Sequence, residues 1–466
     1  MGIIDIILIL VIVGIVLFYW GIFSLIKWFM NRNRIDNDVF DFERDHEEAL
    51  SNKLPSENHK PEGESIFIGT AGKKDVFIPT SAKHIFICGT TGSGKTIAIS
   101  NFIKSGMDYD YPMLIIDGKG DTDAGSLLEI TQNLCHGRKI YVINLNDPKK
   151  SDKYNPFKNT NPDVIKDMLI NMTNWSEEHY KYNTERYIQR LCKLLALKEI
   201  DVSLESLTNY LSVDNFMVLC KELSNQKLIT KEEHMQDIEL AKTSGKIAES
   251  AAARFATIKE SDLGQIFDSS GIDIYTALKE NAVILFILNP LLYPEMSPLI
   301  GNLLIIDSKK AVSNFYQQKK KRIFYILDEI NVYASTALID LVNKSRSANV
   351  TCILATQSLS DLASAEDDNF KEQIIENCNN YIVLRQNSAI NSEAWANILG
   401  TKNTMEVTYQ MKHEQGATVD TGLGSARLVR EFLFHPDEIK SLKTGQAFFL
   451  SRDMGQNCRL QVHKPF

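Results

Sequence analysis

Cysteine is scarce in this sequence, and the cysteines that are present are not grouped. Seven cysteines are spread between positions 88 and 458, with no C-x-x-C pair and no histidine at metal-ligand spacing. Several lie inside apolar runs, where a free thiol behaves as a small buried hydrophobe. The pattern predicts a reducing compartment and no structural zinc site.

An excess of positive charge is also missing. The chain has 51 Lys and Arg against 59 Asp and Glu, a formal net charge of −8. This balance argues against a protein whose whole surface is basic and binds nucleic acid. It still allows a local basic channel, because the electrostatic potential at a site depends on the charges near it and not on the net charge of the chain. With 466 residues, of which 44% are hydrophobic, the chain has a globular composition and the length of two domains.

Charged residues are absent from residues 6–26, which are dominated by Ile, Leu and Val. At about 1.5 Å per residue this run reaches about 30 Å, the thickness of the hydrocarbon core of a bilayer. No Lys or Arg precedes the run, unlike in a secretory signal, whereas Lys27, Arg32 and Arg34 follow it. The positive-inside rule therefore predicts a single-pass anchor in the inner (cytoplasmic) membrane, with the N-terminus outside and the bulk of the chain in the cytoplasm.

A glycine-rich stretch follows a predicted hairpin of "SIFIG" and "DVFIP". "GTTGSGKT" stands between "HIFIC", which has strand character, and "TIAISNFIKSG", which has helical spacing. In that context a G-x-x-x-x-G-K-[ST] sequence predicts a loop whose backbone N–H groups close around a phosphate. We expect Lys95 to face solvent and reach the β- and γ-phosphates, and the Thr96 hydroxyl to bind magnesium. The predicted nucleotide-binding residues are Gly89, Thr90, Thr91, Gly92, Ser93, Gly94, Lys95 and Thr96.

A phosphate loop needs a metal-binding carboxylate and a base, and "RIFYILDEI" supplies both at the end of an apolar run. We expect Asp328 to hold magnesium through water and Glu329 to polarise the attacking water. ATP and Mg2+ are therefore the predicted cofactors. No sequence like "LSGGQ" is present, which disfavours a transporter of the ATP-binding cassette class.

Four further apolar runs are "MLIID", "AVILFIL", "TCILATQ" and "YIVLR". Helical stretches separate them, which is the pattern of a parallel, doubly wound α/β sheet. Gln357 ends the third run, where it either points at the γ-phosphate or is simply a polar strand end. Arg346 precedes the same run, and it either reaches the nucleotide of a neighbouring subunit or forms a surface ion pair.

The α/β pattern is interrupted by a long block with helical periodicity. We therefore expect a transmembrane anchor (1–30), an acidic linker (31–64), a nucleotide-binding domain in two parts (65–157 and 266–466) and an all-α domain between them (158–265). Five cations of the all-α block either contact nucleic acid or belong to a solvated face. They are Lys166, Lys181, Arg186, Arg190 and Arg254.

Together these segments resemble a known family. "HIFICGTTGSGKT", "MLIIDGKGD", "YNPFKN", "FYILDEI", "ILATQSLSDL" and "EFLFHPDEIKSLKTGQAFFL" stand in the order found in the type IV secretion coupling proteins of the TraG/TraD class. The resemblance covers roughly residues 65–466. It implies a RecA-like ATPase domain with an inserted all-α domain, a homo-hexamer around a channel, and ATP-driven movement of single-stranded DNA with its relaxase. The implied partners also include the inner-membrane components of the secretion channel.

The resemblance also implies roles for individual residues. Lys95 and Thr96 match the pair that binds phosphate and magnesium, and Asp328 and Glu329 match the acid pair. Gln357 matches the sensor glutamine, and Arg346 matches an arginine offered to the neighbouring subunit. Asp117 and Lys119, in "DGKG", match accessory positions beside the site.

Two departures from the family pattern concern membrane insertion and cargo. Family members usually have two transmembrane helices, whereas one span is predicted here, and no long acidic tail follows the final strands. Two other functions therefore stay open: a receptor ATPase that sorts protein effectors, and a double-stranded DNA translocase of the chromosome-segregation type. The second would be expected to carry a winged-helix module, and no such module is evident in the sequence.

Overall fold

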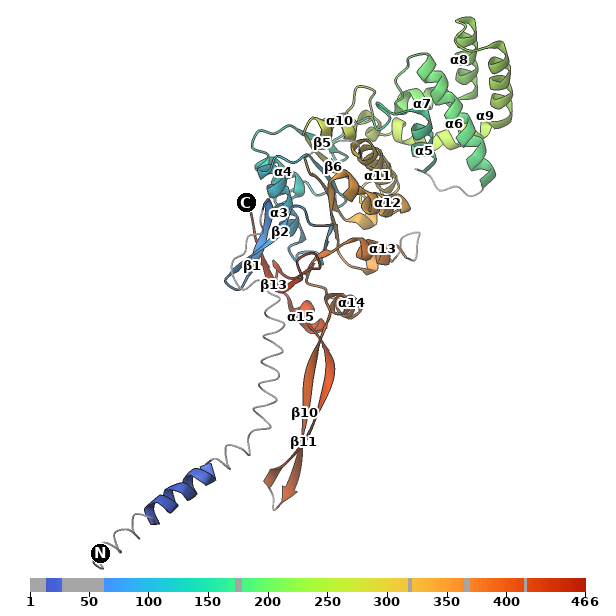
Figure 1. Cartoon of the computed structure of the whole chain (residues 1–466). Coiled ribbons are helices and arrows are strands. Elements are labelled where there is room, and N and C mark those ends of the chain that lie inside the picture. Colours follow the sequence, from blue (N-terminus) through green and yellow to red (C-terminus); the bar gives the residue numbers. More distant parts are fainter. Residues whose placement is uncertain (1–13, 27–62, 172–177, 317–320, 364–368, 415–416) are drawn as a thin grey trace, which may run out of the picture. The chain divides into compact units, whose positions relative to one another are not determined.

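The computed structural model divides the chain into two compact units (Figure 1). One unit comprises Glu57–Trp395 and His435–Phe466, and the other comprises Met1–Ser56 and Ala396–Phe434. The larger unit contains a central sheet, its helices and the candidate site. The described residues are 14–26, 63–171, 178–316, 321–363, 369–414 and 417–466.

An 11-stranded sheet forms the centre of the larger unit, in the order β2-β1-β13-β12-β9-β3-β8-β7-β4-β6-β5. The strands from β9 to β5 run parallel to one another. All of them except the edge strand β5 are buried along their whole length, as strands of a covered parallel sheet are. Their bounds are β3 (Ile85–Cys88), β4 (Met113–Asp117), β5 (Ile140–Asn144), β6 (Val283–Ile287), β7 (Ile323–Asp328), β8 (Val350–Thr356) and β9 (Asn380–Leu384).

The other strands of the sheet are antiparallel, which corrects the prediction of a parallel sheet. β12 pairs antiparallel with β9, and β13 and β1 continue the sheet beyond it. Short turns connect β1 to β2 and β12 to β13, and a short turn joins only antiparallel neighbours. The antiparallel pairs β9–β12 and β1–β13 instead join strands that are far apart in sequence. The predicted hairpin of the first two strands is confirmed. The bounds are β1 (Ser65–Ala71), β2 (Lys74–Pro79), β12 (Gln446–Ser451) and β13 (Gln456–Val462).

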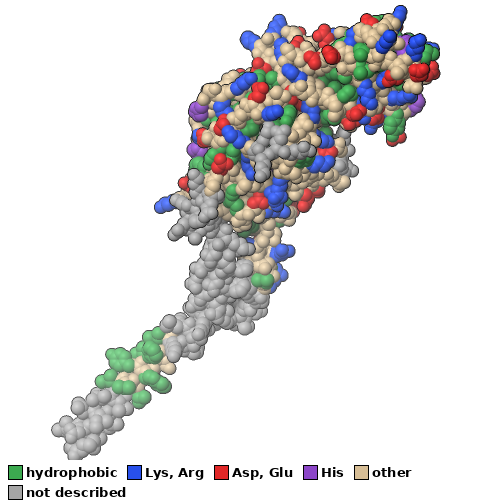
Figure 2. Space-filling model, turned by 45° about the horizontal axis from the view of Figure 1, so that its top comes forward, with side chains coloured by type: hydrophobic (Ala, Val, Ile, Leu, Met, Phe, Trp, Pro, Cys, Tyr) green, Lys and Arg blue, Asp and Glu red, His purple; other side chains and the backbone are tan. Residues whose placement is uncertain are grey.

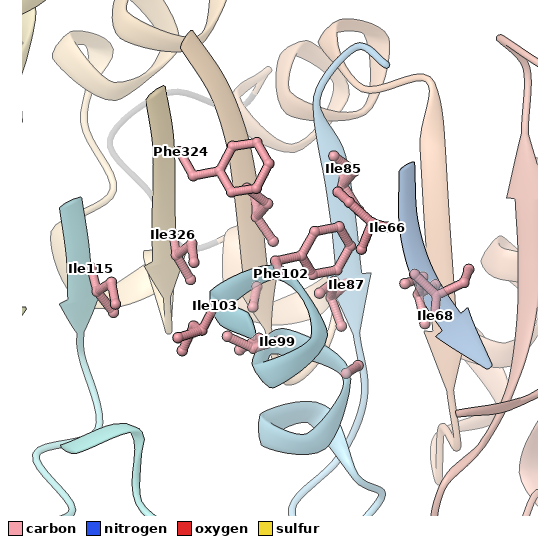
Figure 3. Packing of buried hydrophobic residues seen from close by; sticks show 14 of the residues in the cluster. Ile66, Ile68, Ile85, Ile87, Ile99, Phe102, Ile103, Ile115, Phe324 and Ile326 are labelled. Atoms are coloured by element: carbon pink, nitrogen blue, oxygen red, sulfur yellow. The ribbon is translucent and has the colours of Figure 1, made fainter. Parts of the chain in front are cut away.

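Helix α3 (Lys95–Asp108) packs one face against the centre of the sheet. Ile99, Phe102 and Ile103 of this helix point toward the strands, where they join Ile87 of β3 and Ile326 of β7 in one buried cluster (Figure 3). Full burial of each such side chain contributes about 1.5–3 kcal/mol. This packing fixes the start of α3, and with it the glycine-rich loop that precedes the helix.

The remaining helices of the sheet domain are short, apart from α11. Four single turns of 3-10 helix lie among them. The α-helices are α4 (Leu127–Leu134), α10 (Ile274–Lys279), α11 (Met296–Phe315), α12 (Thr336–Ser345), α13 (Phe370–Asn377), α14 (Ala389–Leu399) and α15 (Pro436–Ser441). The 3-10 turns are η1 (Asp262–Gln265), η2 (Ile330–Tyr333), η3 (Arg346–Ala348) and η4 (Ser360–Leu362).

Five helices between β5 and β6 pack together as a bundle (Figure 1). Arg190 binds Asp237 through two hydrogen bonds of 2.7 and 2.9 Å, and Lys166 pairs with Glu185 at 2.7 Å. Two of the five cations considered for nucleic-acid contact are thus engaged in ion pairs within the bundle. The helices are α5 (Pro162–Asn171), α6 (Glu178–Leu197), α7 (Leu204–Tyr210), α8 (Val213–Asn225) and α9 (Lys231–Glu260).

The "YNPFKN" segment lies where the chain enters the bundle, and it is tied to the place where the chain returns. The Tyr154 N–H donates to the carbonyl of Ile266 at 2.9 Å, and the Tyr154 hydroxyl donates to Asp307 at 2.8 Å. Asp307 is fully buried and also pairs with Lys310 at 2.7 Å. Because a buried carboxylate needs such partners, this junction is held by a polar network rather than by packing alone.

The smaller unit contains a long antiparallel ribbon of β10 (Thr401–Glu414) and β11 (Ala417–Phe432). Glu406 on β10 and Arg427 on β11 are register partners and form an ion pair of 2.6 Å. No hairpin of this length is predicted from the sequence.

Residues 14–26 form a helix with exposed hydrophobic side chains, including Phe18, Trp20 and Phe23 (Figure 2). The beginning of the predicted span, residues 6–13, and nearly all of the predicted linker 31–64 lie outside the described residues. Within the part of the chain that is described, no helix is both long and apolar enough to cross a membrane. The single-pass anchor therefore stays a prediction.

Candidate active site

The glycine-rich loop connects β3 to α3, so a strand, a loop and a helix follow one another as expected from the sequence. Gly92 and Gly94 have φ angles of 74° and 108°, a region that favours glycine. A Cβ atom on Gly89 would lie 2.5 Å from the Ser93 hydroxyl and 2.7 Å from the Leu384 Cβ. The tight turn therefore depends on glycine at these three positions.

Lys95 is the first residue of α3, and its ammonium group is paired with the acids at the end of β7. It contacts the carboxylate of Glu329 and lies 3.7 Å from that of Asp328. Its side chain is only 10% exposed. The expectation that Lys95 faces solvent is therefore wrong, because two buried carboxylates draw its ammonium group inward.

Asp328 and Glu329 are 3% and 5% exposed. Burial raises the pKa of Asp328, and the positive charge of Lys95 opposes that rise. Glu329 has a left-handed backbone, with φ 49° and ψ 55°, which is strained for a residue other than glycine. Such strain persists where the surroundings hold it, and here the Tyr333 hydroxyl donates to the backbone oxygen of Asp328 at 2.9 Å.

Asp117 is the register partner of Asp328 on the neighbouring strand β4. One of its carboxylate oxygens accepts hydrogen bonds from the backbone N–H groups of Lys119 (2.8 Å) and Gly120 (3.2 Å). Burial, with the nearby charge of Asp328, raises the pKa of Asp117 to about 7. The Lys119 ammonium pairs with Asp121 at 2.6 Å, so in this structure it is not paired with the site acids.

Gln357 directly follows β8, and its side chain lies between the loop and the acid pair. Its amide nitrogen donates to Glu329 at 3.1 Å, and its amide oxygen accepts from the Thr91 hydroxyl at 3.4 Å. The structure thus brings Lys95, Glu329 and Gln357 together at the carboxyl ends of β3, β7 and β8. A buried carboxylate and the amide of Gln357 are thus in contact, and such a hydrogen bond limits the orientation of the carboxylate.

Arg346 lies away from this cluster. It belongs to η3, just before β8, whereas Gln357 lies just after the same strand. Seven residues of β8 at about 3.3 Å each separate the two ends by about 20 Å. Arg346 is exposed, so within one chain it does not reach the site.

A magnesium ion fits the residues at this site. One carboxylate oxygen of Asp328, Oδ1, is buried and accepts no hydrogen bond from any described group. Together with the hydroxyl of Thr96, the second residue of α3, it offers the hard oxygen ligands that Mg2+ prefers. Over the described ranges, no cluster of three or more His, Cys, Asp or Glu forms a metal site of its own. A metal here would therefore depend on phosphate oxygens for its remaining ligands.

Two segments that hold the loop carry no predicted role. The carbonyl of Arg385, just after β9, accepts from both the N–H and the hydroxyl of Thr90 at 3.1 Å. On the other side, Thr444 and Gly445 bind the carbonyls of Gly92 and Ser93 at 2.9 and 2.8 Å. Thr444 and Gly445 belong to "SLKTGQAFFL", and only the pairing of β12 with β9 brings this segment to the loop.

Solved structures share this fold. The bacterial conjugative coupling protein TrwBdeltaN70 in its unbound form is 15% identical, with a TM-score of 0.61 over 87% of this chain and 90% of that chain. The plasmid coupling protein TrwB in complex with ADP and Mg2+ is 15% identical, with a TM-score of 0.61 over 87% and 91%. VirB4 of Thermoanaerobacter pseudethanolicus is 11% identical, with a TM-score of 0.54 over 86% and 97%. At these identities the likeness establishes a shared α/β fold.

Sequence comparisons identify the family. An uncharacterized protein of Mycoplasma pneumoniae is 30% identical over 105 residues, which cover 22% of this chain and 70% of that protein. The family model described as the type IV secretion-system coupling protein DNA-binding domain matches residues 75–463. The resemblance found in the sequence motifs is thereby confirmed, and the chain belongs to the family of type IV secretion-system coupling proteins.

Proposed function

We propose that the chain is the coupling ATPase of a type IV secretion system, which binds ATP with Mg2+ and uses its hydrolysis to move single-stranded DNA with an attached relaxase. The observation that carries this proposal is the contact of Lys95 and Gln357 with the same carboxylate, Glu329, beside a glycine loop. In this proposal Lys95 binds phosphate, Glu329 activates water and Gln357 orients Glu329, and their contacts support these roles.

The residues act one after another as the nucleotide enters the site. Lys95 exchanges its contact with Glu329 for the β- and γ-phosphate oxygens, which releases the carboxylate to accept a proton from water. Gln357 keeps Glu329 oriented through its 3.1 Å hydrogen bond. Thr96 and Asp328 would hold Mg2+, which when bound neutralises charge on the phosphate oxygens. Asp117 and Lys119 are accessory, with Asp117 placed beside Asp328 by strand register.

The proposal includes a homo-hexamer in which Arg346 acts on the neighbouring chain. Arg346 is exposed and lies at the opposite end of β8 from Gln357. A head-to-tail contact between copies would bring one end of the sheet near the other, and such heterologous contacts form a ring where the rotation between copies closes. An arginine supplied in this way stabilises charge on the transferred phosphate.

The proposed organisation keeps the five segments predicted from the sequence, with a single-pass anchor at 1–30 and an all-α domain at 158–265. The helix at 14–26 supports the anchor, since its exposed side chains are hydrophobic. The helices from α5 to α9 support the all-α domain. Components of the secretion channel in the inner membrane are the proposed receivers of the DNA.

The test is ATP hydrolysis by the full chain with and without DNA. Single-stranded DNA is expected to stimulate hydrolysis, and its binding is expected to weaken as salt rises, because phosphate contacts release counterions. Lys95→Ala is the control, since it should still bind DNA but not hydrolyse ATP. Stimulation by double-stranded DNA alone would favour a chromosome-segregation type of translocase. Hydrolysis that ignores DNA but responds to a secreted protein would favour an effector-sorting receptor.

A further inference from the structure

The segment between α15 and β12 contacts the phosphate loop from outside. The Gly445 N–H donates to the carbonyl of Ser93 at 2.8 Å, and the Thr444 hydroxyl donates to the carbonyl of Gly92 at 2.9 Å. Two successive carbonyls of the loop are thus held by two successive residues that lie about 350 positions later in the chain.

These bonds determine which way the loop N–H groups point. The peptide unit that joins Ser93 to Gly94 is planar and trans, so its carbonyl and its N–H point in opposite directions. With the Ser93 carbonyl directed at Gly445, the Gly94 N–H is directed away from Gly445. Gly94 is the N-cap of α3, so its N–H is one of those that a helix offers to an anion.

Thr444 and Gly445 are themselves fixed. The carbonyl of Gly445 accepts from the Val462 N–H at 2.8 Å and from the Gln461 side chain at 3.1 Å, both on β13. Gly445 has a φ of 79°. A Cβ atom on Gly94 would lie 3.0 Å from the Gly445 nitrogen. The two glycines therefore allow a close backbone contact between the loop and the antiparallel end of the sheet.

We propose that Thr444 and Gly445 form a clamp that sets the phosphate loop in its nucleotide-binding conformation, with Thr444 as a positioning residue for ATP. The inference rests on the proposed function, because the ligand of the loop is the phosphate of ATP. The clamp leaves the reacting groups untouched, and loop N–H groups bind the phosphates of the ground state and the transition state alike. Loss of the clamp should therefore raise KM and leave kcat nearly unchanged.

The test is Thr444→Val, which keeps the shape of the side chain and removes its donor. We expect the Kd for ADP and the KM for ATP to rise about 5- to 10-fold, which corresponds to the loss of one net hydrogen bond. The kcat should stay within about twofold of the wild-type value. Thr444→Ser restores the donor and should restore both constants. Thr257→Val is the matched control, since the exposed Thr257 hydroxyl also donates to a backbone carbonyl, that of Ala253 at 2.8 Å, but on α9.

The outcomes separate the clamp from the proposed function. An unchanged Kd and KM in Thr444→Val, or an equal effect of Thr257→Val, would overturn the clamp while leaving the ATPase in place. A fall in kcat at constant KM would also overturn it, because the role would then lie in the chemical step. If the wild-type chain failed to hydrolyse ATP, the proposed function would fail, whereas the Kd for ADP would still test the clamp.

Discussion

Lys95 and Glu329 form an ion pair that joins the first residue of α3 to the end of β7. The Lys95 ammonium also lies 3.7 Å from Asp328, so one cation compensates two buried acids before any nucleotide is present. An entering phosphate must therefore compete with Glu329 for Lys95. In the proposed mechanism, the group that binds the phosphate is therefore also the group that holds the base.

Replacement of the base should separate binding from hydrolysis. In Glu329→Gln the competing negative charge is lost, so Lys95 is freer to bind phosphate. We expect the rate of hydrolysis to fall by about 10²- to 10⁴-fold, with ATP bound at least as tightly as by the wild type. Equilibrium binding of ATP and steady-state hydrolysis measure the two effects. Lys95→Ala is the contrasting variant, and it should lose binding as well; weaker ATP binding by Glu329→Gln would argue against the competition.

Asp117 should make the stability of the fold depend on pH. Its pKa rises from 3.8 to about 7 because it is buried beside Asp328. Between about pH 4 and pH 7 the folded chain keeps a proton that the unfolded chain has released, so the free energy of unfolding decreases as the pH rises. From about pH 5 to pH 8 this carboxyl should remove up to about 3 kcal/mol.

Asp117→Asn tests this pH dependence, because the amide does not titrate. Chemical denaturation in magnesium-free buffer at the two pH values should show the variant gaining stability relative to the wild type as the pH rises. A difference between the two proteins that stays constant with pH would show that Asp117 titrates at its ordinary value.

Arg346 should act across a subunit boundary. Arg346→Ala is expected to lower hydrolysis by about 10³-fold without changing nucleotide binding by the chain that carries the substitution. Mixing the Arg346→Ala chain with the Lys95→Ala chain should recover activity. The Lys95→Ala chain still carries Arg346, which it can supply to the intact phosphate loop of a neighbouring Arg346→Ala chain. Lys344→Ala is the matched control, since Lys344 is an exposed cation two residues away that pairs with Asp340 at 3.3 Å. No recovery on mixing would place Arg346 outside the reaction.

Tyr154→Phe should loosen the junction between the sheet and the helical bundle. The change removes the hydroxyl that donates to the fully buried Asp307. We expect a loss of about 1–2 kcal/mol in the free energy of unfolding, measured by chemical denaturation. Tyr182→Phe is the control, because Tyr182 is 60% exposed. Equal stability of the two variants would show that the Asp307 network is satisfied without Tyr154.

The strands nearest the site were predictable because they are buried on both faces. β3, β4, β6, β7, β8 and β9 each consist of a continuous apolar run, which the sequence shows directly. β5 is absent from the predicted strands, since it lies at an edge and is mostly half-buried. β12 and β13 are joined by a short turn, but the antiparallel pairing of β12 with β9 depends on contacts distant in sequence.

The identities of the candidate site residues could be predicted from the sequence, whereas their burial, distances and contacts could not. The glycine-rich motif identifies Lys95, but it does not predict that the side chain is buried and contacts Glu329. That contact depends on how α3 packs against β7. The position of Arg346 before β8 was clear from sequence order, whereas its distance from Gln357 follows only from the length of the strand. Thr444 could not be linked to the loop from its sequence, since hydrogen bonds to carbonyls require no particular motif.

The ribbon of β10 and β11 starts and ends at paired residues, since Thr401 and Phe432 are register partners. Partners in an antiparallel ladder lie about 5 Å apart, so the chain returns almost to the place from which it departed. β12 pairs directly with β9 without using the ribbon. The ribbon therefore contributes no strand to the sheet that carries the candidate site, and a turn of a few residues could close the same gap.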